Sequence, residues 1–134
     1  MTRLTATTLG SICDDVKRLA QHRLKIGDIV YGRRGDIGRC ALISERENGW
    51  FCGTGCLRIS LGESVVNPRF LYYYLGQSDI IGWICNQAIG ATLPNLNTSI
   101  IRSIPISYPT LKSQEQIADI LKDLYLYEKR KHLE

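Results

Sequence analysis

Arginines and glycines are concentrated in one short stretch of the sequence, residues 27–40 (GDIVYGRRGDIGRC). Its three arginines are Arg33, Arg34 and Arg39. A guanidinium is a planar fork of donors that fits phosphate oxygens or the O6 and N7 atoms of guanine in a major groove. Glycines carry no side chain, so they allow the backbone to approach a large ligand closely. The stretch predicts a nucleic-acid contact loop, and the alternative is a hairpin whose arginines are solvated.

Two neighbours of these arginines belong to the same candidate site. Tyr31 closes the apolar run before the loop, and Asp36 can accept from a cytosine amine or hold an adjacent arginine in place. Upstream cations extend the site as a phosphate-facing flank: Lys17, Arg18, Arg23 and Lys25. From position 17 to position 39, seven basic and two acidic residues give a net charge of +5, against +4 for the whole chain. This concentration is typical of a polyanion-binding surface, although a solvated face is the plain alternative.

A second polar stretch, residues 92–98 (TLPNLNT), offers asparagine side chains. Asn95 can pair with an adenine or contact the DNA backbone, and its alternative role is that of a turn residue. For Asn97 we favour a helix cap.

Catalysis and metal binding have little support in the sequence. It contains neither a nucleophile elbow, nor a zincin motif, nor a nucleotide-binding glycine loop. The two histidines lie near opposite ends, and the five cysteines lack the spacing of a disulfide framework or a zinc site. We therefore expect a non-catalytic protein without a metal or other cofactor and with free thiols. Because no apolar run is long enough for a bilayer and residues 1–15 lack a secretory core, we expect a cytoplasmic location without a membrane partner.

The candidate loop is expected to lie between two short strands, at residues 29–31 and 39–44. Further strands are predicted at 50–52 and 56–60 after an Asn-Gly turn, and residues 14–25 form either a short basic helix or an extended arm. Helices are predicted from the Asn67 cap to Gly76, at 79–88 and at 98–102, followed by an extended segment at 104–109. The predicted fold class is mixed α/β: a small mixed or antiparallel sheet with packed helices in one domain.

The C-terminal segment predicts a long helix. Ser113 and Gln116 have the spacing of a capping box, and apolar residues then alternate three and four positions apart. We call these four residues the seam: Ile117, Ile120, Leu124 and Tyr127. The seam fits either a helix packed on its own domain or half of a coiled coil with another chain.

Five blocks in a fixed order resemble the specificity (S) subunit of type I restriction–modification systems. They are GDIVYGRRGDIGRCALI, WFCGTGCLRI, NPRFLYYYL, GATLPNLNTSIIRSIPI and QEQIADIL. The resemblance implies that residues 1–109 are a partial target recognition domain for one half of a bipartite site in double-stranded DNA. It also implies that residues 110–134 begin a spacer helix that forms a coiled coil.

In that family the S subunit itself performs no chemistry. It directs methylation subunits, and through them restriction subunits, to the DNA site, and S-adenosylmethionine, ATP and magnesium belong to those partners. Only residues 15–26 separate the TTLGSICD block from GDIVYGRRG, where the family usually has a long variable segment. The chain therefore resembles a truncated half-subunit. The alternative function is an assembly protein that no longer reads DNA and acts through its C-terminal helix, for example as a homodimer.

Overall fold

The computed structural model describes residues 4–12, 15–18, 23–33, 37–51, 55–62, 65–87 and 96–132, with the backbone alone at 15–18 and 132. Strands and helices alternate irregularly along the chain. In order, the elements are β1 (Thr5–Thr8), α1 (Leu9–Ile12), β2 (Asp15–Arg18), β3 (Ile29–Gly32), β4 (Cys40–Leu42), the 3₁₀ turn η2 (Glu45–Glu47), β5 (Cys56–Ser60), α2 (Pro68–Leu75), α3 (Ser78–Gln87), α4 (Thr98–Arg102), β6 (Pro105–Tyr108) and α5 (Leu111–His132).

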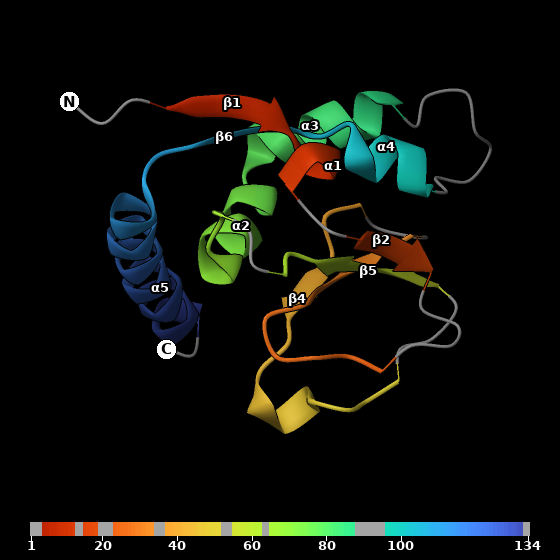
Figure 1. The fold of residues 1–134 in the computed structure, drawn as a ribbon. Coiled ribbons are helices and arrows are strands. Elements are labelled where there is room, and N and C mark those ends of the chain that lie inside the picture. The colour runs from red at the N-terminus through yellow and green to blue at the C-terminus, as the bar shows by residue number, and fades with distance from the viewer. Residues whose placement is uncertain are drawn as a thin grey trace.

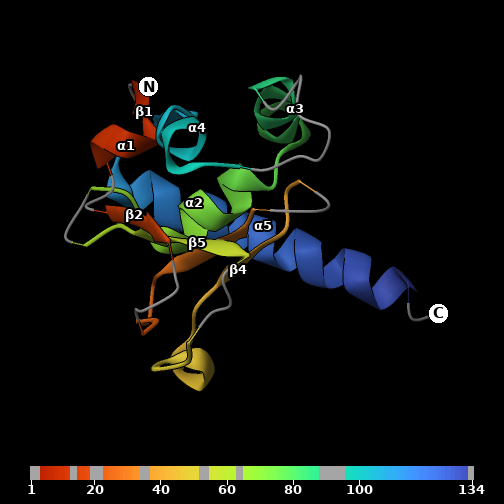
Figure 2. The same cartoon turned by 90° about the vertical axis from the view of Figure 1, so that its right-hand side faces the viewer.

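The strands form two antiparallel sheets. β2, β5, β3 and β4 make a four-stranded sheet in that order, and β1 pairs with β6 in a two-stranded sheet. Figures 1 and 2 show α1, α2, α3 and α4 on one side of the four-stranded sheet and η2 on the other. This confirms the predicted mixed α/β class with small antiparallel sheets.

The two faces of the four-stranded sheet bury different amounts of apolar surface. On the inner face, Ile29 and Tyr31 of β3 lie opposite Ile59 and Leu57 of β5, and all four are at most 1% exposed. They belong to the main core together with helix residues such as Leu71, Leu75, Ile84 and Ile101. On the outer face, a smaller cluster consists of Leu24, Val30 and Ile43 with Cys56 against it. The inner face therefore holds the fold together, and the outer face is less completely covered.

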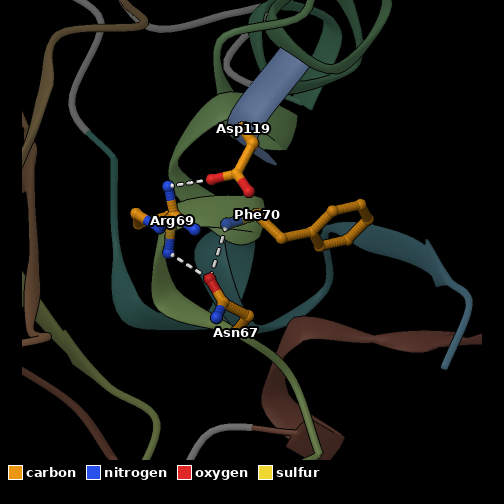
Figure 3. A network of polar contacts seen from close by, with 4 residues as sticks. All are labelled: Asn67, Arg69, Phe70 and Asp119. Atoms are coloured by element: carbon orange, nitrogen blue, oxygen red, sulfur yellow. Dashed lines mark hydrogen bonds and ion pairs between the residues drawn. The ribbon is translucent and has the colours of Figure 1, made fainter. Parts of the chain in front are cut away.

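α2 begins where its sequence predicts. The Asn67 side-chain oxygen accepts from the backbone N–H groups of Arg69 (2.9 Å) and Phe70 (3.2 Å), as Figure 3 shows, and Pro68 occupies the first helical position. Asn97 caps α4 in the same way, accepting from the N–H of Ile100 at 2.8 Å. Both predicted caps are confirmed.

Four predictions about local structure need correction. Residues 15–18 form a strand paired with β5, so the helical alternative for this part of the basic arm is wrong. The strand expected at 50–52 is represented by a bridge between Arg23 and Phe51. α5 begins at Leu111, and the Thr110 hydroxyl accepts from the Ser113 N–H (3.4 Å), so the predicted cap at Ser113 is wrong. The spacing of the apolar residues at 80, 81, 84 and 85 predicts one buried face for α3, but only Ile80 and Ile84 are buried and Cys85 is exposed.

Candidate nucleic-acid interface

A shallow groove opens on the outer face of the four-stranded sheet. Its volume is about 330 Å³, and its lining consists of Val30, Gly32, Arg39, Cys40, Ala41, Gly55 and Cys56. The Gly32 N–H donates to the Arg39 carbonyl at 2.8 Å, which places these two residues side by side at the open end of the β3–β4 pair. The Arg39 side chain is exposed. The groove is therefore lined by one exposed arginine and by mostly small residues, so a phosphate or base edge can approach the sheet there.

Arg33 has a structural task that its sequence context did not reveal. Its side-chain Nε donates to the Leu96 carbonyl at 3.1 Å, and its backbone N–H donates to the Gly55 carbonyl at 2.8 Å. The Leu96 N–H in turn donates to the Arg33 carbonyl at 3.0 Å. Arg33 therefore ties the segment before α4 to the edge of the groove, and Nε of its guanidinium is directed inward.

Tyr31 cannot contact a duplex in this structure, so its assignment to the DNA-binding set is wrong. Its side chain is 0% exposed and lies in the main core. Burial of the ring raises the pKa of the phenol from 10.0 to about 12, with the nearby thiols of Cys40 and Cys85 as further causes. The physical reason for the correction is the register: Tyr31 lies opposite Cys40 and Leu57, on the inner face.

Gly38 is also explained by packing rather than by ligand approach. Its φ is +106°, a conformation that L side chains rarely adopt, and a Cβ there would lie 3.0 Å from Cδ1 of Ile81 in α3. The loop before β4 therefore needs a glycine at this position to pass close to Ile81 of α3.

The upstream cations fall into two groups. Lys17 and Arg18 lie in β2, opposite Arg58 and Leu57, and only their backbones are described. The Arg23 guanidinium lies 4.9 Å from the ring centre of Phe51, and Lys25 is exposed nearby. The remaining members of the predicted site, Arg34, Asp36 and Asn95, lie outside the described residues. The structure thus brings Arg23 and Lys25 together beside the sheet and places Arg39 at the groove.

An ion pair that sequence reasoning missed supports this side of the sheet. Asp28 is 4% exposed, and its Oδ2 accepts from the Lys25 N–H at 2.9 Å and lies 3.9 Å from Nη1 of Arg58. The same Nη1 donates to the Arg23 carbonyl at 3.2 Å. Arg58 and Asp28 therefore fix the backbone that carries Arg23 and Lys25. The Gly27-Asp28 turn signal points to this role, because aspartate at turns commonly bonds to backbone N–H groups.

An exposed aromatic pair, also not predicted as part of a site, borders these cations. Trp50 and Phe51 are 56% and 63% exposed, and the Leu24 N–H donates to the Trp50 carbonyl at 3.0 Å. The signal in the sequence was the pair of adjacent aromatic residues directly after the Asn-Gly turn. Aromatic rings beside cations are compatible with contact to bases.

The seam lies on a different side of α5 from the residues that contact the domain. Gln114 and Ala118 are 0% exposed, whereas the seam residues are 37–60% exposed: Ile117, Ile120, Leu124 and Tyr127. At 3.6 residues per turn, the seam is rotated about 120° from the line of Gln114 and Ala118. α5 therefore packs on its own domain through the line of Gln114 and Ala118, and the seam is left largely exposed.

Two further observations concern chemistry that the described residues can support. Within the described ranges, no group of three or more His, Cys, Asp or Glu side chains is placed to hold a metal ion. Burial raises the pKa of the Cys40 thiol from 9.0 to about 11, which disfavours the nucleophilic thiolate.

In the part of the chain that the structure describes, no helix combines the length and apolar character that crossing a bilayer requires.

Known proteins share both the sequence pattern and the fold. A family model described as "Type I restriction modification DNA specificity domain" matches residues 6–134. A curated protein of Haemophilus influenzae, named as a type I restriction enzyme specificity subunit, is 33% identical over 97 residues, which are 72% of this chain and 24% of that protein.

Solved structures resemble the chain over nearly its whole length. One, from a study of complex assembly and conformational transition of the type I R-M system, has a TM-score of 0.80 at 15% identity. The match covers 97% of this chain and 44% of the matched chain, and coverages are given in this order below. The HsdS subunit from Thermoanaerobacter tengcongensis has a TM-score of 0.76 at 17% identity, with coverages of 96% and 44%. The S subunit from M. genitalium has a TM-score of 0.66 at 19% identity, with coverages of 96% and 40%. The chain spans less than half the length of each of these relatives.

Proposed function

The chain belongs to the type I restriction–modification DNA specificity domain family, and on that premise we propose that it is a DNA-recognition module that reads one half of a bipartite site in double-stranded DNA. Residues 1–109 are then the partial target recognition domain, and residues 110–134 begin the spacer helix. The module performs no catalysis. It directs methylation subunits, and through them restriction subunits, to the DNA, and S-adenosylmethionine, ATP and magnesium act in those partners.

The observation that carries this proposal is the outer-face groove. Arg39 is an exposed lining residue there, and Arg23 and Lys25 lie on a backbone fixed by Arg58 and Asp28. Guanidinium groups on a rigid sheet supply both phosphate contacts and the bidentate geometry that reads guanine. Lys17, Arg18 and Arg34 extend the basic surface, and Asp36 and Asn95 are candidate base contacts.

Duplex DNA titration at two salt concentrations tests this function. If about six cations contact phosphates, the affinity should fall roughly a thousandfold between 50 and 200 mM salt, because each neutralised phosphate releases counterions. The titration is made with the chain alone and with the methylation subunits present. An affinity that does not change with salt, in both arrangements, contradicts the DNA-binding proposal.

A second function, assembly through α5, is favoured by the exposed seam. Four large apolar side chains on one side of a helix are the pattern of a coiled-coil surface, so we infer that a second copy or a methylation subunit covers them. Leu124→Asp places a charge at the centre of the seam and should abolish association in sedimentation. Lys122→Asp, which changes a residue outside the seam, is the control. If DNA binding is undetectable in wild type while Leu124→Asp still abolishes association, the assembly function alone remains.

A further inference from the structure

Gln114 is a fully buried polar residue at the start of α5. Its side chain makes three hydrogen bonds to backbone groups of other segments: Oε1 accepts from the Asn67 N–H (2.7 Å), and Nε2 donates to the carbonyls of Val65 (2.9 Å) and Pro109 (2.9 Å). It is 0% exposed. One amide therefore joins the segment before α2, the end of β6 and the first turn of α5.

An ion pair to α2 and a buried alanine lie on the same side of α5. The Arg69 Nη1 donates to Oδ1 of Asp119 at 2.8 Å, as Figure 3 shows. Ala118, one turn after Gln114, is 0% exposed. The Asn67 carboxamide that caps α2 belongs to the residue whose N–H binds Gln114, so the α2 cap and the α5 anchor share one residue. We call this set the joint: Asn67, Arg69, Gln114, Ala118 and Asp119.

Beyond the joint, α5 extends away from the domain. Figure 2 shows its C-terminal half projecting past the other elements. The described side chains after Leu121 are all exposed. The 18 residues from 115 to 132 span about 27 Å at 1.5 Å per residue. A tilt of about 10° at Gln114 would therefore move the far end of α5 by about 5 Å, more than the roughly 3.4 Å rise of one base pair.

We propose that Gln114 is a positioning residue that sets the direction of α5, and through it the separation of the two half-sites read by a pair of recognition modules. This rests on the proposed function, in the arrangement where a second copy covers the seam and joins two modules through their helices. A side-chain amide suits this role because its three bonds fix position and orientation together, whereas an apolar contact permits sliding. The bonds also connect segments up to 49 residues apart, so the direction is set by the whole domain.

The experiment selects bound sequences from a pool of randomised duplexes, with the wild-type chain and with variants, alone and with methylation subunits. Gln114→Met keeps the length of the side chain but removes its three hydrogen bonds. Gln116→Met is the matched control, because Gln116 is exposed on the same turn. We expect Gln114→Met to select the same half-site sequences as wild type. The number of base pairs between the two half-sites, which we call the gap, should change by at least one base pair or spread over several lengths. Gln116→Met should select the wild-type gap.

A charge exchange at the edge of the joint keeps the test valid if Gln114→Met does not fold. Asp119→Lys places a cation against Arg69 at an exposed position and should change the gap in the same way, and Arg69→Glu with Asp119→Lys should restore it. A wild-type pool without any enriched half-site overturns the proposed function. If the wild-type pool has a fixed gap and Gln114→Met leaves that gap unchanged, the role of the joint alone is overturned. The same holds for Asp119→Lys where it is used in place of Gln114→Met.

Discussion

Replacing Tyr31 by phenylalanine distinguishes a core residue from a DNA contact. The phenol has a pKa of about 12 in the fold, raised from 10.0 mainly by burial. The fold favours the neutral phenol. The contribution of the Tyr31 side chain to stability is therefore complete below pH 10 and is lost as the pH rises from 10 towards 12. From the two pKa values, the free energy of unfolding should fall by about 0.8 kcal/mol between about pH 8 and about pH 10.5. Tyr31→Phe cannot ionise and should be spared this loss.

Urea unfolding followed by circular dichroism at the two pH values measures the effect. Wild type should lose about 0.8 kcal/mol more than Tyr31→Phe on going to the higher pH. Tyr127→Phe, which changes an exposed tyrosine of α5, should behave as wild type. DNA affinity at neutral pH should be the same for Tyr31→Phe and wild type. Equal alkaline losses in the two proteins, or weaker DNA binding by Tyr31→Phe, would refute the assignment of this side chain to the core.

Three other variants test separate parts of the structure. Arg39→Gln should weaken DNA binding and reduce the slope of log affinity against log salt by about 0.9, since one phosphate contact is lost; an unchanged slope in a salt titration would exclude a phosphate contact. Asn67→Ala should lower the free energy of unfolding by about 1 kcal/mol, because two N–H groups of α2 lose their acceptor; urea denaturation gives the value. Gly38→Ala should lower it by at least about 1 kcal/mol, through its positive φ and the contact with Ile81. Gly49→Ala, with a positive φ but open space around it, is the comparison that isolates the steric part, and equal losses would contradict the close contact.

Local signals in the sequence predicted the elements whose ends depend on neighbouring residues. The Asn67-Pro68 pair places an acceptor and a fixed φ at the first turn of α2, and nothing distant is needed to explain where that helix begins. Asn97 does the same for α4. α5 differs because Thr110 and Ser113 are both good caps, so local sequence does not choose between them. The first turn of α5 also contains Gln114, whose partners lie at the distant positions 65 and 67 as well as at 109.

The candidate site was less predictable because its residues take their roles from distant parts of the chain. Ile29, Val30 and Tyr31 are all apolar, so the pattern does not say which of them faces inward; pairing with β5 decides it. The bond from Arg33 to Leu96 spans 63 positions, and no short-range pattern reveals it. Arg39 directly precedes β4, and it is exposed while its neighbour Cys40 packs against the core, as alternation along an extended segment requires.

The unequal faces of the four-stranded sheet separate the residues that maintain the fold from those that meet its surroundings. Ile29, Leu57 and Ile59 point into the main core, whereas Arg39 and Ala41 lie on the outer side at the groove. Exchanges at the outer positions leave the apolar contacts of the inner face untouched. A library randomised at 39 and 41 should therefore yield mostly folded proteins, which makes this sheet a practical starting point for engineering new target preferences without redesigning the scaffold.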